Sequence, residues 1–157
     1  VGPEGWFVET IIHGRWDLLE TARKIFNAVV EYKPVSVGIE KGIAQQAVMS
    51  PLNDLMKQRN RFFRVEMLTH GNKRKVDRVV WALQGRMEHG RVWLNPEGDW
   101  QPTFLDQLFQ FPSELTHDDL IDALSYVDQL AEVAYPGTFA QIDSDGDWDP
   151  LDETTGY

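Results

Sequence analysis

The feature that most constrains the fold is an alternation of short apolar runs with amphipathic segments between residues 35 and 94. The pattern predicts, in order, a strand at 35–39, a helix at 45–58, a strand at 62–68, a helix at 73–89 and a strand at 91–94. Strands that are separated by helices pair in parallel, because the helix crosses back over the sheet. The sequence therefore predicts an α/β domain with parallel neighbours in its sheet.

Segments on either side of this region extend the prediction. They are a strand at 6–12 and helices at 17–32, 104–109 and 117–133. Asp17 suits the start of the first of these helices and Pro34 ends it. Pro51 predicts a break or restart within the helix at 45–58, because proline lacks a backbone N–H.

Length and composition limit the classes of protein that the chain can belong to. Its 157 residues, of which 42% are hydrophobic, suffice for one core, and the absence of cysteine excludes disulfides, thiolate catalysis and zinc–sulfur sites. No apolar run approaches the roughly 18 residues of a membrane span, so we expect no membrane partner. No linker divides the chain; we expect one domain at 1–140 and a mobile acidic tail at 141–157.

Charge is distributed very unevenly along the chain, whose net charge is −10. Residues 92–157 contain no lysine or arginine, whereas residues 57–91 are strongly basic. The basic residues of that segment are Lys57, Arg59, Arg61, Arg64, Lys73, Arg74, Lys75, Arg78, Arg86 and Arg91. Such a block indicates contact with a polyanion, although a solvated helix face balanced by acids elsewhere remains an alternative.

Two groups of carboxylates are candidates for chemistry. Glu40 follows the apolar strand at 35–39, and ligands of open α/β sheets bind at the carboxyl ends of strands. A turn acid paired with Lys41 is the alternative interpretation.

The second group is Asp118, Asp119 and Asp122. Spacings of three and four residues place these carboxylates on one helix face, where two of them can bind one cation. With Thr116 as N-cap, Asp118 and Asp119 would also be favoured by the helix dipole. Asp122 would lie past the first turn and gain little from it, so like-charge repulsion there calls for a compensating cation.

Phosphodiester hydrolysis explains why carboxylates from separate elements would be gathered. The reaction needs an activated water and stabilised charge on the phosphorus and leaving oxygens, which two hard cations about 3.5–4 Å apart supply. Hard cations prefer carboxylate oxygens. The sequence contains no glycine-rich phosphate loop, no G-x-S-x-G elbow and no HExxH motif that would indicate another chemistry.

The motifs around these acids resemble a known family. Residues 109–112 (FQFP) and 115–126 (LTHDDLIDALSY) resemble the C-terminal motif of phage terminase large subunits, which forms the last helix of an RNase H-like nuclease. Further segments that resemble this family in order and spacing are 5–8 with 14–15, 37–40, 71–75 and 90–94. The resemblance implies an RNase H-like mixed sheet flanked by helices.

The resemblance also implies a function and roles for individual residues. The family matures concatemeric double-stranded DNA with two Mg²⁺ or Mn²⁺ ions, behind an upstream ATPase motor and beside a portal and a small terminase subunit, in the host cell cytoplasm. By position, Glu40, Asp119 and Asp122 would be metal ligands and catalytic residues, and Asp118 a further or alternative ligand. His117 would contact these ligands without binding the metal ion itself. Residues that would hold the DNA backbone are Lys73, Arg74, Lys75 and Arg78.

One departure from the family pattern affects these expectations. RNase H-like nucleases have their first catalytic aspartate on a strand upstream of the segment that residues 5–10 resemble, and neither Glu9 nor Asp17 stands in its place. We therefore expect a fragment whose metal site lacks one wall. Two other functions remain open: another RNase H-like nuclease of the resolvase or transposase type, or a non-catalytic module that docks on DNA or a portal.

Overall fold

The computed structural model describes residues 1–2, 4–69, 74–113 and 117–134. The elements are β1 (Trp6–Val8), α1 (Leu18–Tyr32), β2 (Val37–Glu40), α2 (Ile43–Gln58), β3 (Val65–Leu68), α3 (Lys75–Glu88), β4 (Val92–Leu94), α4 (Gln101–Gln110), α5 (Asp119–Ser125) and α6 (Val127–Ala134). The alternation predicted between residues 35 and 94 is confirmed. The predicted tail at 141–157 lies outside the described residues.

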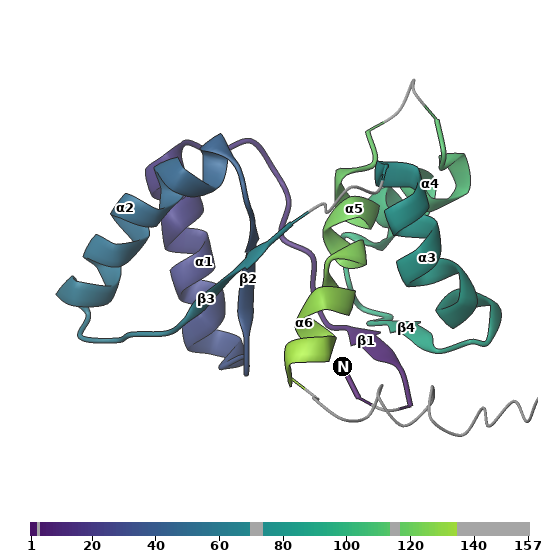
Figure 1. Ribbon diagram of the computed structural model, residues 1–157, viewed down its shortest axis with the longest axis horizontal. Coiled ribbons are helices and arrows are strands. Elements are labelled where there is room, and N and C mark those ends of the chain that lie inside the picture. The colour runs from purple at the N-terminus through teal and green to yellow at the C-terminus, as the bar shows by residue number, and fades with distance from the viewer. Residues whose placement is uncertain (3, 70–73, 114–116, 135–157) are drawn as a thin grey trace, which may run out of the picture.

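The strands form two short parallel sheets. β1 pairs with β4 and β2 pairs with β3, both in parallel, as the connecting helices require. Among the described residues, no strand joins the two pairs, so the expected sheet is present as two separate pieces. Each strand is only three or four residues long. The result is an α/β fold with helices beside both sheets, consistent with the RNase H-like class (Figure 1).

One half of the molecule consists of α1, α2, β2 and β3, here called the α1–α2 half (Figure 1). As predicted, Asp17 caps α1: its Oδ1 accepts a hydrogen bond from the N–H of Glu20 at 2.8 Å. Ala22 and Phe26 of α1 pack in one core cluster with the buried face of α2.

The predicted break at Pro51 is wrong, because α2 continues through it. Proline removes one helical hydrogen bond, but Val48, Leu52 and Met56 bury their side chains on the same face of α2 on both sides of it. Burial of this continuous apolar face stabilises the helix against the local loss.

The other half, here called the α3–α5 half, contains β1, β4, α3, α4 and α5 and has its own core (Figure 1). Trp100 and Phe104 lie at its centre with their rings edge to face, 5.9 Å apart at an interplanar angle of 83°. Ile121 of α5 is fully buried in the same cluster. This core fixes α5 against α3 and α4, and therefore positions the acids at the start of α5.

The predicted helix at 117–133 is divided into α5 and α6. The buried Ser125 hydroxyl donates to the carbonyl of Asp122 at 2.6 Å, and the N–H of Tyr126 bonds to the carbonyl of Ala123, three residues back. A side chain that competes for a helical carbonyl and a three-residue bond both interrupt an α-helix.

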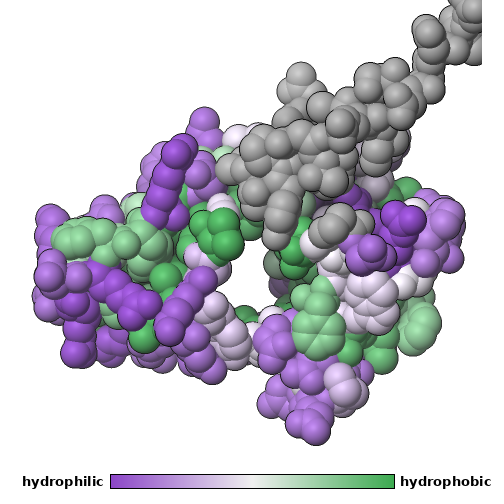
Figure 2. Space-filling model, turned by 90° about the horizontal axis from the view of Figure 1, so that it is seen from below, coloured by the Kyte–Doolittle hydropathy of each residue, from purple (hydrophilic) through white to green (hydrophobic). Residues whose placement is uncertain are grey.

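Helix α6 connects the two halves. The Gln129 side chain accepts a hydrogen bond from the N–H of Thr69 at 3.2 Å and donates one to the carbonyl of Thr69 at 2.9 Å, just after β3. An opening through the molecule lies between the two halves (Figure 2). A pocket of about 670 Å³ lies between β1 and α5 and also borders Tyr32 and Pro34 of the α1–α2 half.

Within the part of the chain that the structure describes, no helix combines the length and the apolar character needed to cross a bilayer.

Substitution of Phe104 tests the core of the α3–α5 half. Phe104→Ala should lower the free energy of unfolding by about 3–5 kcal/mol, because it opens a cavity at a fully buried position. Phe109→Ala on the same helix is the matched control; its ring is 82% exposed, so little change is expected. Urea denaturation of both variants measures the difference, and equal losses would contradict this core assignment.

Candidate active site

Glu40 lies at the carboxyl end of β2, as the sequence predicted. It is opposite Leu68 in the parallel register, and the next residue, Lys41, donates its backbone N–H to the carbonyl of Leu68 at 2.7 Å. The Glu40 side chain is hydrogen-bonded to Tyr126, which follows α5. The strand end is thereby joined to the helix that contains the other acids.

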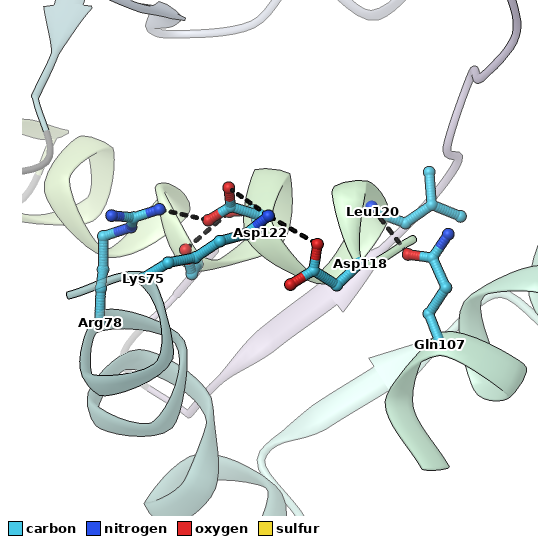
Figure 3. Close-up of polar contacts among 7 residues, drawn as sticks. Lys75, Arg78, Gln107, Asp118, Leu120 and Asp122 are labelled. Atoms are coloured by element: carbon cyan, nitrogen blue, oxygen red, sulfur yellow. Dashed lines mark hydrogen bonds and ion pairs between the residues drawn. The ribbon is translucent and has the colours of Figure 1, made fainter. Parts of the chain in front are cut away.

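The Asp118 carboxylate does not cap α5 and can therefore contact other side chains. Asp118 is the N-cap residue, but its side chain makes no capping hydrogen bond. Gln107 of α4 takes that role, since its Oε1 accepts from the N–H of Leu120 at 2.9 Å (Figure 3). The helix begins at Asp119, so Asp122 lies in its first turn, and the prediction that it lies beyond that turn is wrong. Thr116, the predicted N-cap, lies outside the described residues.

Four charged residues on α3 and at the start of α5 form what we call the charge cluster: Lys75, Arg78, Asp118 and Asp122. The Nζ atom of Lys75 lies 2.6 Å from Oδ1 of Asp118 and 3.3 Å from Oδ2 of Asp122. Nη2 of Arg78 contacts Oδ1 of Asp122 (Figure 3). The two carboxylates thus converge on one ammonium group, and the like charges at i,i+4 spacing are compensated.

The two cations of the charge cluster differ in burial. Arg78 is 7% exposed, and its guanidinium lies 4.6 Å from the centroid of the Tyr126 ring. The side chain of Lys75 is 40% exposed. Partial burial lowers the pKa of Lys75, but the hydrogen bond to Asp118 and the charges of Asp122 and Asp118 outweigh it, so the pKa is raised and the ammonium stays charged.

Tyr126 responds electrostatically to both groups of acids. Burial raises its pKa to about 12; Arg78 opposes the rise, whereas Glu40 and Asp122 add to it. Acids from β2 and from α5 therefore act on one buried ring. Glu40 and Asp122 thus both lie near the Tyr126 phenol.

The other predicted site residues are placed differently. Asp119 and His117 are exposed. Arg74 is exposed and forms an ion pair with Asp77 through contacts of 2.9 and 3.2 Å. Lys73 lies outside the described residues. Arg78 is buried and contacts Asp122. Its predicted contact with a DNA backbone stays a prediction.

Binding of a divalent ion can be assessed from the donors present. Among residues 1–2, 4–69, 74–113 and 117–134, no group of three or more His, Asp or Glu side chains closes on one point. The carboxylates of Asp118 and Asp122 nevertheless converge on a single cationic atom. Mg²⁺ is commonly held by one or two carboxylates together with waters and substrate phosphates. The donor pair therefore fits a hard cation.

Two residues of this site were not found from the sequence. Tyr126 follows Asp118 and Asp122 at the same four-residue spacing, so helical periodicity would have placed it beside them. Gln107 gave no such signal, because its contact with Leu120 arises only when α4 packs against α5.

Removal of Arg78 should show its structural role. Arg78→Met is expected to lower the free energy of unfolding by about 3–5 kcal/mol, because it leaves the largely buried Asp122 with only the half-exposed Lys75. Arg74→Met, one helical turn earlier, removes an exposed ion pair and should cost less than about 1 kcal/mol. Chemical denaturation compares the two, and equal costs would show that Asp122 does not depend on Arg78.

The raised pKa of Tyr126 predicts a loss of stability at alkaline pH. The unfolded chain loses the phenol proton near pH 10 and the folded chain near pH 12, so the free energy of unfolding falls across this interval by on the order of 2 kcal/mol. Tyr126→Phe should remove this part of the fall. Tyr32→Phe, at a site 45% exposed, is the control and should retain most of it, because the pKa of Tyr32 is raised less than that of Tyr126. Urea unfolding at about pH 9 and about pH 11.5 measures the difference; the same alkaline loss in both variants would contradict the assignment.

Comparison with known proteins assigns the chain to a family. Residues 5–128 match the terminase RNaseH-like domain, a span that includes both halves of the fold, Glu40 and the whole charge cluster. No significant match was found among curated proteins or among solved structures. A terminase domain of this kind has a nuclease-type role. The motifs first noticed in the sequence and the α/β architecture agree with this match, and the chain belongs to the terminase RNaseH-like domain family.

Proposed function

We propose that the chain is a metal-dependent endonuclease domain that cuts concatemeric double-stranded DNA during viral genome packaging. The observation that supports this most directly is the convergence of the Asp118 and Asp122 carboxylates on one cationic atom, with Glu40 joined to the same cluster through Tyr126. RNase H-like nuclease domains generally use divalent metals, and Asp118 and Asp122 offer carboxylate oxygens, the donors that such ions prefer.

The proposed ligands come from two elements. Asp118 and Asp122 supply carboxylates from the start of α5, and Glu40 supplies one from the end of β2. Asp119, the first residue of α5, is exposed, and we retain it as an alternative metal ligand beside Asp122. Two bound Mg²⁺ or Mn²⁺ ions would supply an activated water and stabilise charge on the scissile phosphate.

The protein side chains around the ligands orient them. Arg78 contacts Asp122 from its buried position on α3 and limits the directions that this carboxylate can take. The Tyr126 hydroxyl donates a hydrogen bond to the Glu40 carboxylate and keeps its proton at physiological pH, because its pKa is about 12. These two contacts hold acids from different halves of the molecule in fixed positions before substrate binds.

The basic residues next to the acids would bind the DNA backbone. Arg74 and Lys75 lie at the start of α3 with exposed and half-exposed side chains, and we add Lys73 from the sequence alone. Contacts of this type bind phosphates without reading base sequence. They also weaken with salt, so binding should be strongest at low ionic strength.

The proposed setting follows from the family. A terminase nuclease would work in the host cell cytoplasm together with an upstream ATPase motor, a portal and a small terminase subunit. A competing proposal is a non-catalytic module that docks on DNA or on a portal. The observation that favours it is that Lys75 and Arg78 already pair with Asp118 and Asp122.

Substitution of Asp122, the ligand common to both proposed aspartate pairs, tests the proposed chemistry. Plasmid nicking by this chain in Mn²⁺ should disappear with EDTA and fall by about a hundredfold or more in Asp122→Asn, because cation-assisted charge stabilisation is worth several kcal/mol. Asp77→Asn removes an acid of α3 that forms an ion pair with Arg74 and contacts none of the proposed ligands, and it should retain nicking. Comparison of Asp118→Asn with Asp119→Asn then identifies the second helix ligand.

A thermal melt of the same proteins separates the two proposals. Mn²⁺ at about 100 times its dissociation constant should stabilise the wild-type protein by about 2.7 kcal/mol and leave Asp122→Asn unchanged. Absence of both nicking and Mn²⁺-dependent stabilisation in the wild-type protein would reject the endonuclease and favour the docking module.

A further inference from the structure

We propose that Lys75 couples DNA binding to metal loading: its ammonium group occupies the cation position between Asp118 and Asp122 and leaves that position to bind a DNA phosphate. This inference rests on the proposed nuclease function, because it concerns the same acids. It assigns to Lys75 a role in positioning and exchange, in addition to the backbone contact suggested by charge alone.

The distances place the ammonium group where a divalent ion would bind. Nζ of Lys75 lies within 3.3 Å of one oxygen from each carboxylate, so it contacts both at once. Close approach of a second cation to the same two oxygens is opposed by electrostatic repulsion and by the space that the ammonium group fills. Lys75 and a metal ion therefore compete for one position.

Burial indicates which of the two basic residues can exchange. Arg78 is 7% exposed, contacts Asp122 and lies against the ring of Tyr126, so its removal from the cluster would leave a buried charge unpaired. The side chain of Lys75 is 40% exposed and has four flexible carbons. Ion pairs with this exposure are weak and easily exchanged. Lys75 is thus the exchangeable cation and Arg78 the fixed one.

The neighbouring residue supports a phosphate as the alternative partner. Arg74 precedes Lys75 at the start of α3, and its side chain is 84% exposed. A duplex held by Arg74 would bring a phosphate near the Lys75 ammonium. Transfer of the ammonium group to the phosphate would leave Asp118 and Asp122 with less compensating charge, which increases their affinity for a divalent cation. Bound DNA should then raise the affinity for the metal ion, and a bound metal ion should raise the affinity for DNA by the same factor.

Mn²⁺ titration of the full 157-residue chain without DNA is the first test. Lys75→Gln should bind Mn²⁺ about three- to tenfold more tightly than the wild-type protein, because the competing ammonium group is absent. Lys57→Gln makes the same change of charge at an exposed position of α2 and should bind like the wild-type protein. Lys75→Arg keeps a cation and should also stay close to wild type. Calorimetry gives the affinities, and thermal melting confirms that each variant is folded.

DNA affinity with and without Mn²⁺ is the second measurement. A labelled phosphorothioate duplex, followed by fluorescence anisotropy at constant ionic strength, should bind the wild-type protein more tightly in Mn²⁺. The gain should be at least threefold smaller in Lys75→Gln than in Lys57→Gln. Because Mn²⁺ also screens repulsion between DNA and the acids, only this difference between variants reports on Lys75.

The possible results separate the inference from the proposed function. Equal Mn²⁺ affinity in Lys75→Gln, Lys57→Gln and wild type, with weaker binding in Asp122→Asn, would overturn the role of Lys75 and leave the metal site intact. Equal affinity in Asp122→Asn and wild type would reject the ligand set itself, and the inference with it. Tighter binding in Lys75→Arg as well as in Lys75→Gln would show that occupancy by a cation is not the cause.

Discussion

Two negative charges on one face of a short helix are the constraint on which the rest of the site depends. Asp118 and Asp122 stand one turn apart at the start of α5, and like charges at this spacing destabilise a helix unless cations compensate them. Helix α3 supplies both cations, Lys75 and Arg78, from adjacent turns. Helix α3 must therefore lie beside the start of α5, and the core formed by Val79, Leu83 and Ile121 has to be compatible with that placement.

Helix α3 repeats the same arrangement further along its length. Arg86 forms an ion pair with Asp128 of α6 at 2.7 Å, and its guanidinium lies 4.3 Å from the Trp6 ring centroid. Apolar burial supplies the attraction between α3 and its neighbours, but it does not by itself define how far one helix is shifted along another. Paired charges at both ends of the contact define this shift, because a displaced helix would leave partly buried charges without partners.

The sequence predicted the parts of this structure that depend on local pattern. Apolar periodicity located β2, β3 and α3. The spacing of Asp118 and Asp122 predicted carboxylates on one side of the helix, and both contact the ammonium group of Lys75. The sequence prediction was wrong where packing decides, because α2 continues through Pro51 with its apolar face buried. Packing also covers Arg78 with Tyr126, which nothing in the neighbouring sequence indicated. A run of charged letters does not show which cation will be buried. That outcome depends on which residues α5 and α6 bring against α3.

The residues of the proposed site come from both halves of the molecule, and this affects how their spacing can be changed. Glu40 belongs to the α1–α2 half, whereas Asp118 and Asp122 belong to the α3–α5 half. Among the described residues, the contacts that join the halves include the hydrogen bond of Tyr126 to Glu40 and the bonds of Gln129 to the backbone of Thr69. The distance between Glu40 and the two aspartates therefore depends on how α6 is placed between the halves. Substitutions at Gln129 would alter the spacing of the site without touching any proposed ligand.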